Sequence, residues 1–158
     1  MKIETGYLYH IKDEFFDIVN DDNLMTSHER GKRRPTYFTI KDGDILWFIP
    51  LSSKVDKYKK IIDKKIEKYG VCNTILIENV FDKKAVILLQ NAFPTLEKYI
   101  QSRHTVDGKA IKIASAVERE IIDDFEYMLS LKTSGLDLFF TDIDFIKNLM
   151  LDELKVLN

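Results

Sequence analysis

Apolar and polar positions follow two rhythms along this chain, and the change between them predicts where strands and helices lie. Alternation with a short period, in segments rich in β-branched and aromatic residues, indicates strands. Apolar residues three and four positions apart indicate helices. On this basis we expect strands over 3–11, 35–40, 45–51, 74–80, 84–91 and 108–113, a short helical turn over 94–100, and helices over 12–19, 54–69, after Ser115 and over 142–154.

The predicted strands come mostly as hairpins. Asp42-Gly43 is a tight-turn signal between one pair of strands, and Asp82-Lys83 separates another pair. Within the apolar stretch 45–51, the strand itself is expected to end at Pro50, because proline has no N–H to donate to a central ladder. Hairpins with inserted helices and a helical C-terminal part predict an α+β fold: a compact, twisted antiparallel sheet with flanking helices.

Composition agrees with one folded unit. The chain has 158 residues, of which 45% are apolar, and the 7 Tyr and 10 Phe can fill a core of that size. We therefore expect a single domain over 1–158. A single cysteine, Cys72, excludes an internal disulfide. No apolar stretch is long enough for a bilayer and the N-terminus carries no signal-peptide pattern, so we expect a cytoplasmic protein without a membrane partner.

The charge is unevenly distributed although the net charge is only −2. The segment 28–69 holds 12 Lys and Arg against 6 Asp and Glu, and the rest of the chain is acidic. A basic segment on an acidic chain suggests a local site for a polyanion, and a solvated lysine-rich helix face explains it equally well.

The sequence gives little support for metal-dependent catalysis or for nucleotide hydrolysis. The histidines have no ligand spacing among themselves or with Cys72, and neither a phosphate-cradling glycine loop nor a serine elbow is present. We therefore expect no metal and no cofactor. The polar residues that remain gather at one strand-to-helix junction, Ser52-Ser53-Lys54, and in the loop before the first hairpin.

Two interpretations of that junction stay open. Ser53 can cap the helix over 54–69 with its side chain. The same helix start presents unpaired N–H groups and partial positive charge to an anion, with Lys54 and Lys57 beside it. Such groups suffice for metal-free RNA cleavage, in which the 2′-OH attacks the adjacent phosphate and leaves a 2′,3′-cyclic phosphate and a 5′-OH. DNA, which lacks the 2′-OH, is not a substrate of this reaction.

The segments "RRPTYFTIKDGDILWFIPLSSKVDKY", "AVILLQNAFPTLEKYI" and "FFTDIDFIKNL" resemble the toxins of type III toxin–antitoxin systems, the group that includes ToxN, AbiQ, TenpN and CptN. The resemblance covers roughly residues 30–150 and is closest to the CptN/TenpN branch. It implies a Kid/MazF-like fold and a metal-independent endoribonuclease. It also implies an RNA antitoxin cut from a repetitive transcript and folded as a pseudoknot, a closed toxin–RNA hetero-oligomer, and a role in growth arrest and phage defence.

The resemblance places the family's key hydroxyl at Ser53, with Ser52 beside it, and leaves open whether Lys54 or Lys57 serves the leaving group. It matches Gln90 and Asn91 to a family segment as either buried amides or RNA contacts. The candidate catalytic residues are Ser52, Ser53, Lys54, Lys57 and His28. The candidate RNA-binding residues are Arg30, Lys32, Arg33, Arg34, Lys57, Lys60 and Lys64. The alternatives are a non-catalytic RNA-binding module and a related ribonuclease toxin neutralised by a protein.

Overall fold

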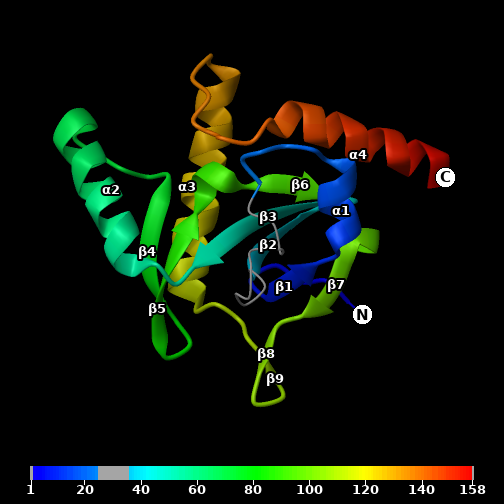
Figure 1. The fold of residues 1–158 in the computed structure, drawn as a ribbon, viewed down its shortest axis with the longest axis horizontal. Coiled ribbons are helices and arrows are strands. Elements are labelled where there is room, and N and C mark those ends of the chain that lie inside the picture. Colours follow the sequence, from blue (N-terminus) through cyan, green and yellow to red (C-terminus); the bar gives the residue numbers. More distant parts are fainter. Residues whose placement is uncertain (1, 25–35, 158) are drawn as a thin grey trace.

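A computed structural model describes residues 2–24 and 36–157 of the chain (Figure 1). Its larger helices are α1 (Asp13–Ile18), α2 (Val55–Tyr69), α3 (Ser115–Thr133) and α4 (Ile143–Leu157), with single 3-10 turns η1 (Leu89–Asn91) and η2 (Glu97–Tyr99). Its strands are β1 (Leu8–Ile11), β2 (Tyr37–Asp42), β3 (Ile45–Ser52), β4 (Ile75–Val80), β5 (Lys83–Leu88), β6 (Phe93–Thr95), β7 (Ile100–Arg103), β8 (Thr105–Val106) and β9 (Lys109–Ala110).

Seven of these strands form one sheet in the order β4-β5-β3-β2-β1-β7, with β6 also paired to β3. Every strand pair in it is antiparallel. The α+β fold with an antiparallel sheet and flanking helices is therefore confirmed. Within the described ranges, no helix is both long enough and apolar enough to cross a membrane.

Side-chain alternation divides the β4–β5 hairpin between two apolar clusters. Leu76 and Ile87 belong to the main core, whereas Ile75 and Val86 belong to a small cluster completed by α2. Since neighbouring residues of a strand point to opposite faces, α2 covers one face of this hairpin and the main core lies on the other. Figure 1 shows α2 at the edge of the molecule, standing apart from the other helices.

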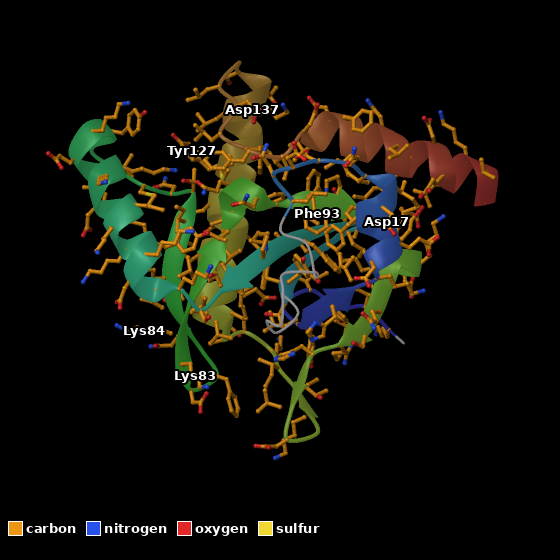
Figure 2. All side chains as sticks on the ribbon, viewed as in Figure 1. Asp17, Lys83, Lys84, Phe93, Tyr127 and Asp137 are labelled. Carbon is orange, nitrogen blue, oxygen red and sulfur yellow. The ribbon has the colours of Figure 1, made fainter. Side chains whose placement is uncertain are left out.

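The main core is aromatic. Phe93 of β6 stacks on Phe15 of α1 at 5.2 Å between ring centroids, and Tyr37 of β2 meets Phe93 edge-on at 5.5 Å. On the opposite face of the sheet, Trp47 of β3 packs against Phe125 of α3 at 5.1 Å. Figure 2 shows Phe93 enclosed by the elements around it, whereas Lys83 and Lys84 project from the tip of the β4–β5 hairpin.

The expected end of β3 at Pro50 is wrong, because the strand continues to Ser52. The Leu51 N–H donates to the Thr36 carbonyl at 3.0 Å, so the Pro50 nitrogen faces away from β2. On that other side, β3 pairs with β6 as far as Phe48 and with β5 only from Leu51. Pro50 therefore occupies the point where β3 changes neighbours and no donor is required.

Other segments also differ from expectation: the strands expected over 3–11 and 84–91 are confined to Leu8–Ile11 and Lys83–Leu88, and two further segments pair differently. Residues 93–95 pair with β3 as β6, and only the following residues form the expected helical turn. In the segment 108–113, only Lys109 and Ala110 form a strand, which pairs with β8 in a separate hairpin. Both corrections concern pairings with distant or very short partners, which local periodicity does not record.

Candidate functional site

The junction between β3 and α2 is held by its backbone. The Val55 N–H donates to the Ser53 carbonyl at 2.9 Å, and the Lys54 N–H donates to the Ser52 hydroxyl at 3.2 Å. Lys54 is the N-cap residue, and no side chain caps α2. The interpretation of Ser53 as a side-chain cap is therefore wrong, because the tight turn gives the cap position to the next residue.

This arrangement leaves donors available at one place. Ser53 is exposed, and its hydroxyl makes no hydrogen bond to any residue that the structure describes. The N–H groups of Asp56 and Lys57, in the first turn of α2, also have no acceptor within residues 2–24 and 36–157. A hydroxyl and two N–H groups at the positive end of a helix form a small donor set suited to a phosphate.

A row of lysines begins at this donor set. Lys57, Lys60 and Lys64 follow one another at helical spacing, so they share one face of α2, and all three are exposed. None of them forms an ion pair with a carboxylate in the part of the chain that the structure describes. Their charge therefore remains available to an external polyanion.

The remaining predicted site residues, His28, Arg30, Lys32, Arg33 and Arg34, lie outside the described residues. The two amides matched to the family segment have partners within the protein. The Gln90 Oε1 accepts from the Lys65 Nζ at 2.9 Å, and the Asn91 Nδ2 donates to the Asn23 carbonyl at 3.1 Å. Of their two interpretations, the structural one has direct contacts to support it.

Sequence reasoning missed a pair of histidines. His10 of β1 and His104, directly after β7, lie 3.0 Å apart between Nε2 and Nδ1, although 94 residues separate them. At least one of these two nitrogens must be unprotonated for the bond to form. The pair exists because β1 and β7 are neighbours in the sheet. No local spacing in the sequence records that neighbourhood.

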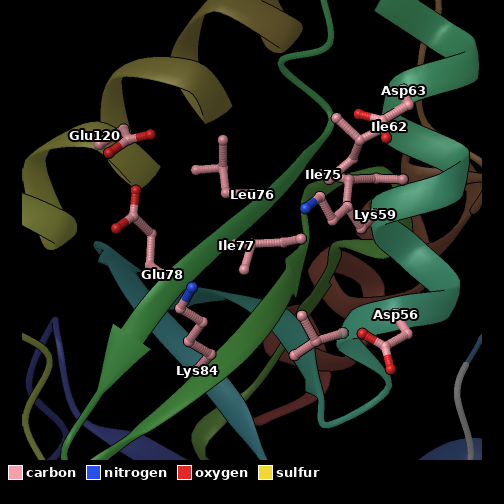
Figure 3. A pocket seen from close by; sticks show the side chains of 11 residues that line it. Asp56, Lys59, Ile62, Asp63, Ile75, Leu76, Ile77, Glu78, Lys84 and Glu120 are labelled. Atoms are coloured by element: carbon pink, nitrogen blue, oxygen red, sulfur yellow. The ribbon is translucent and has the colours of Figure 1, made fainter.

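A cleft of about 610 Å³ extends from the first turn of α2 along β4, the outer strand of the sheet (Figure 3). The floor of the cleft is apolar. Charged residues from α2, α3, β4 and β5 surround it: Asp56, Lys59, Asp63, Glu78, Lys84 and Glu120. Figure 3 shows the Glu78 and Glu120 carboxyl groups facing each other. Partial burial raises the pKa of Glu120 to about 7, and the hydrogen bond and charge of Glu78 add to the rise.

This cleft adjoins the Ser53 junction but differs from it chemically. It shares only the first turn of α2 with the junction, and its carboxylates repel a phosphate. No group of three or more His, Cys, Asp or Glu side chains suited to hold a metal ion occurs among the residues described. Because the cleft carries carboxylates and the start of α2 carries lysines, the cationic end of α2 is the better candidate for binding an anionic substrate.

Comparison with known proteins finds a structural likeness but no match by sequence. No protein-family model matches the chain, and no curated protein matches it by sequence. Among solved structures, the fold is similar to that of AbiQ, a lactococcal anti-phage endoribonuclease of a type III toxin–antitoxin system. The TM-score is 0.74 at 14% sequence identity, and the match covers 96% of this chain and 99% of AbiQ. At this identity, the match shows a common fold.

Proposed function

We propose that this protein is a metal-independent endoribonuclease, the toxin of a type III toxin–antitoxin system. The observation that carries the proposal is the open donor set at Ser53, which stands at the start of a helix whose lysines have no carboxylate partners among the residues described. The likeness of the whole fold to an endoribonuclease of that class supports it.

The reaction follows from the charges that must be stabilised. The RNA 2′-OH attacks the adjacent phosphorus, and the phosphorane gains negative charge on its oxygens. Ser53 and the N–H groups after it bind those oxygens, and Lys54 or Lys57 neutralises the charge and gives a proton to the departing 5′ oxygen. Ser52 holds the turn through its bond to the Lys54 N–H. Arg33 and Arg34 bind neighbouring phosphates, and His28 acts as the base that takes the proton from the 2′-OH.

The lysine row and the arginines define the RNA-binding surface in this proposal. Lys57, Lys60 and Lys64 follow the RNA backbone away from the scissile phosphate, and Arg30 and Lys32, which precede β2 in the sequence, contribute further charge. The proposed partners are cellular RNA and an RNA antitoxin, which the toxin cuts from repeats and which then folds as a pseudoknot in a toxin–RNA hetero-oligomer. The proposal also assigns the protein to the CptN/TenpN branch of these toxins and places it in the cytoplasm.

Two single substitutions test the chemistry. Ser53→Ala and Lys54→Ala, assayed on a repeat-free single-stranded RNA in a metal chelator, each lower the cleavage rate by roughly a hundredfold or more. Products of the parent protein carry 2′,3′-cyclic phosphate and 5′-OH ends, and a DNA strand of the same sequence stays intact. Ser115→Ala and Lys109→Ala are matched controls, because both residues are exposed and lie on other elements.

The outcomes separate the alternatives. Parent-level cleavage by both test variants contradicts the assignment of the site. RNA binding without any cleavage by the parent protein favours a non-catalytic RNA-binding module. Cleavage that no repeat RNA inhibits, but that a small protein encoded beside the toxin does inhibit, favours a protein antitoxin.

A further inference from the structure

The second half of α2 holds a lysine in a fixed position without neutralising it. The Lys65 Nζ donates to the Thr74 Oγ1 at 3.1 Å and to the Gln90 Oε1 at 2.9 Å. Both acceptors are uncharged and buried, with relative exposures of 8% for Thr74 and 5% for Gln90. Because an ammonium group has three N–H donors, one remains for another acceptor. No carboxylate pairs with Lys65 in the described part of the chain.

Exposed aromatic rings flank this lysine. Its Nζ lies 5.6 Å from the centroid of the Phe140 ring, and Phe140 is 51% exposed. Tyr69, one helical turn after Lys65, is 65% exposed, and the Lys68 Nζ lies 5.1 Å from its ring centroid. Burying an exposed aromatic ring against a ligand is favourable, so rings that stand beside unpaired cations offer a surface on which an anionic, partly apolar ligand can bind.

The chemistry of this surface selects one kind of occupant. Proteins hold single-stranded nucleic acid by stacking bases on aromatic rings while cations bind the phosphates. Lys65 and Lys68 supply the cations, and Phe140 and Tyr69 supply the rings. Negative charge on the occupant is favoured, because neither lysine has a carboxylate partner among the residues described and both charges are therefore available to an external phosphate.

We propose that Lys65, Lys68, Tyr69 and Phe140 form a second RNA-contact site, in which an unpaired base stacks on a ring and its phosphate binds the lysines. The proposal rests on the proposed ribonuclease function and specifies how the substrate strand is held. At 1.5 Å of rise per residue, Lys65 lies about 16 Å along α2 from Lys54. That span corresponds to a few nucleotides, so the site holds RNA away from the cleaved bond and favours strands long enough to reach both places.

Two uncleavable probes test this site. They are fluorescent 2′-O-methyl oligoribonucleotides of about 4 and about 12 nucleotides, whose lengths bracket a junction-only and a two-site contact. The double variant Tyr69→Leu with Phe140→Leu keeps apolar bulk and removes both rings. We expect it to bind the long probe roughly tenfold or more weakly than the parent does, because each lost base–ring stack weakens binding by this order. Its affinity for the short probe stays at the parent value.

Matched variants distinguish stacking from general damage. Phe145→Leu, which removes another exposed ring on α4, leaves both affinities unchanged. Phe140→Trp retains tight binding of the long probe because it keeps a ring. Lys65→Gln weakens the long probe while it retains a polar side chain near Thr74 and Gln90. Thermal unfolding of each variant shows whether the fold is intact.

Several results overturn the inference. If the double variant binds the long probe as tightly as the parent does, the rings form no RNA-contact site and are better explained by a protein partner. The proposed function is unaffected by that result as long as the parent protein cleaves RNA. An equal loss with both probes shows that the rings act through the Ser53 junction and form no separate site. A parent protein that neither binds the long probe nor cleaves RNA overturns this inference and the proposed function together.

Discussion

The helices α2 and α3 pack on opposite faces of the sheet and differ in almost every physical respect. Helix α2 has no fully buried residue and carries six lysines against three acidic residues. Helix α3 buries Ile121, Phe125 and Met128 and carries five acidic residues against two basic ones. One helix is fixed by deep apolar contacts, and the other is attached by a small cluster and by the hydrogen bonds of Lys65.

Under the proposed function, the difference assigns two separate tasks to the two helices. Apolar burial is the main source of folding free energy, and α3 supplies it to the core. A surface that binds a polyanion must keep its cations hydrated and unpaired, which excludes deep burial. Helix α2 is therefore suited to binding because it contributes little to the core. Four predictions, from the largest expected effect to the smallest, test this division.

The first prediction concerns stability. Phe125→Ala removes a ring that contacts Trp47 and Phe139 in the core, and it lowers the free energy of unfolding by about 3–5 kcal/mol. The matched change on the other helix, Ile62→Ala, lowers it by at most about 2 kcal/mol because Ile62 is only partly buried. Urea unfolding measures both. Equal losses would show that α2 is as structural as α3.

The second prediction concerns RNA binding by the two helices. Replacing Lys57, Lys60 and Lys64 together by glutamine weakens RNA binding by roughly tenfold to a hundredfold at low salt, and lowers the slope of log affinity against log salt by about 2. The comparison variant neutralises Asp123, Asp124 and Glu126 on α3 and does not weaken binding. Titrations at several salt concentrations decide. An unchanged slope for the lysine variant would place the RNA elsewhere.

The third prediction compares the helix ends. Gly70 closes α2 with φ +82°, a conformation that disfavours residues with a Cβ, and its N–H donates to the Ile66 carbonyl at 2.7 Å. Gly70→Ala therefore lowers the free energy of unfolding by about 1 kcal/mol. Ser134, which ends α3 at φ −83°, tolerates alanine with a smaller loss. Thermal melts of both variants show whether the left-handed end is a specific requirement of α2.

The fourth prediction concerns the carboxyl pair between α3 and β4. The pKa of Glu120 is raised from 4.5 to about 7 in the folded protein, so the folded state binds the proton more tightly than the unfolded state does. The contribution of protonated Glu120 to stability is therefore fully present below the unfolded pKa of 4.5, and it is lost as the pH rises through the folded pKa of about 7. Glu120→Gln is more stable than the parent at about pH 8, by less than about 1 kcal/mol since the site is solvent-screened, and equal to it at about pH 4.

The control for this measurement is Glu126→Gln, on the same helix but outside the cleft. A Glu120→Gln variant whose advantage over the parent did not grow between the two pH values would show that the carboxyl pair does not share a proton.

Local patterns in the sequence predicted the parts of the fold that local energetics determine. The helix over 54–69 is confirmed apart from its first residue, and the last helix starts as expected at Asp142, whose Oδ1 accepts the Phe145 N–H at 3.2 Å. The predicted capping of α2 by Ser53 was wrong because the helix begins one residue later than expected, which makes Lys54 the N-cap residue. Pro50 was misjudged because its tolerance depends on which strand lies beside it, and that neighbour is distant in sequence.

For the candidate site, the sequence indicated a strand-to-helix junction but not the residues around it. Ser53 stands where a strand meets a helix, and a chain pattern alone locates such a place. The contact of His10 with His104 and the fixing of Lys65 by Gln90 both join segments far apart in the chain. The order of the strands and the packing of α2 beside η1 bring these residues together. No local pattern in the sequence records either arrangement.

The position of β3 bears on how such a site can be controlled. β3 is paired to β2 on one side and to β6 and then β5 on the other, and it is buried along nearly its whole length, so the serine that follows it is attached directly to a central strand of the core. A conformational change that displaced Ser53 would disturb the core and approach the free energy of global unfolding. We therefore expect that silencing this protein requires a cover placed over the junction from outside, rather than an internal movement that distorts it.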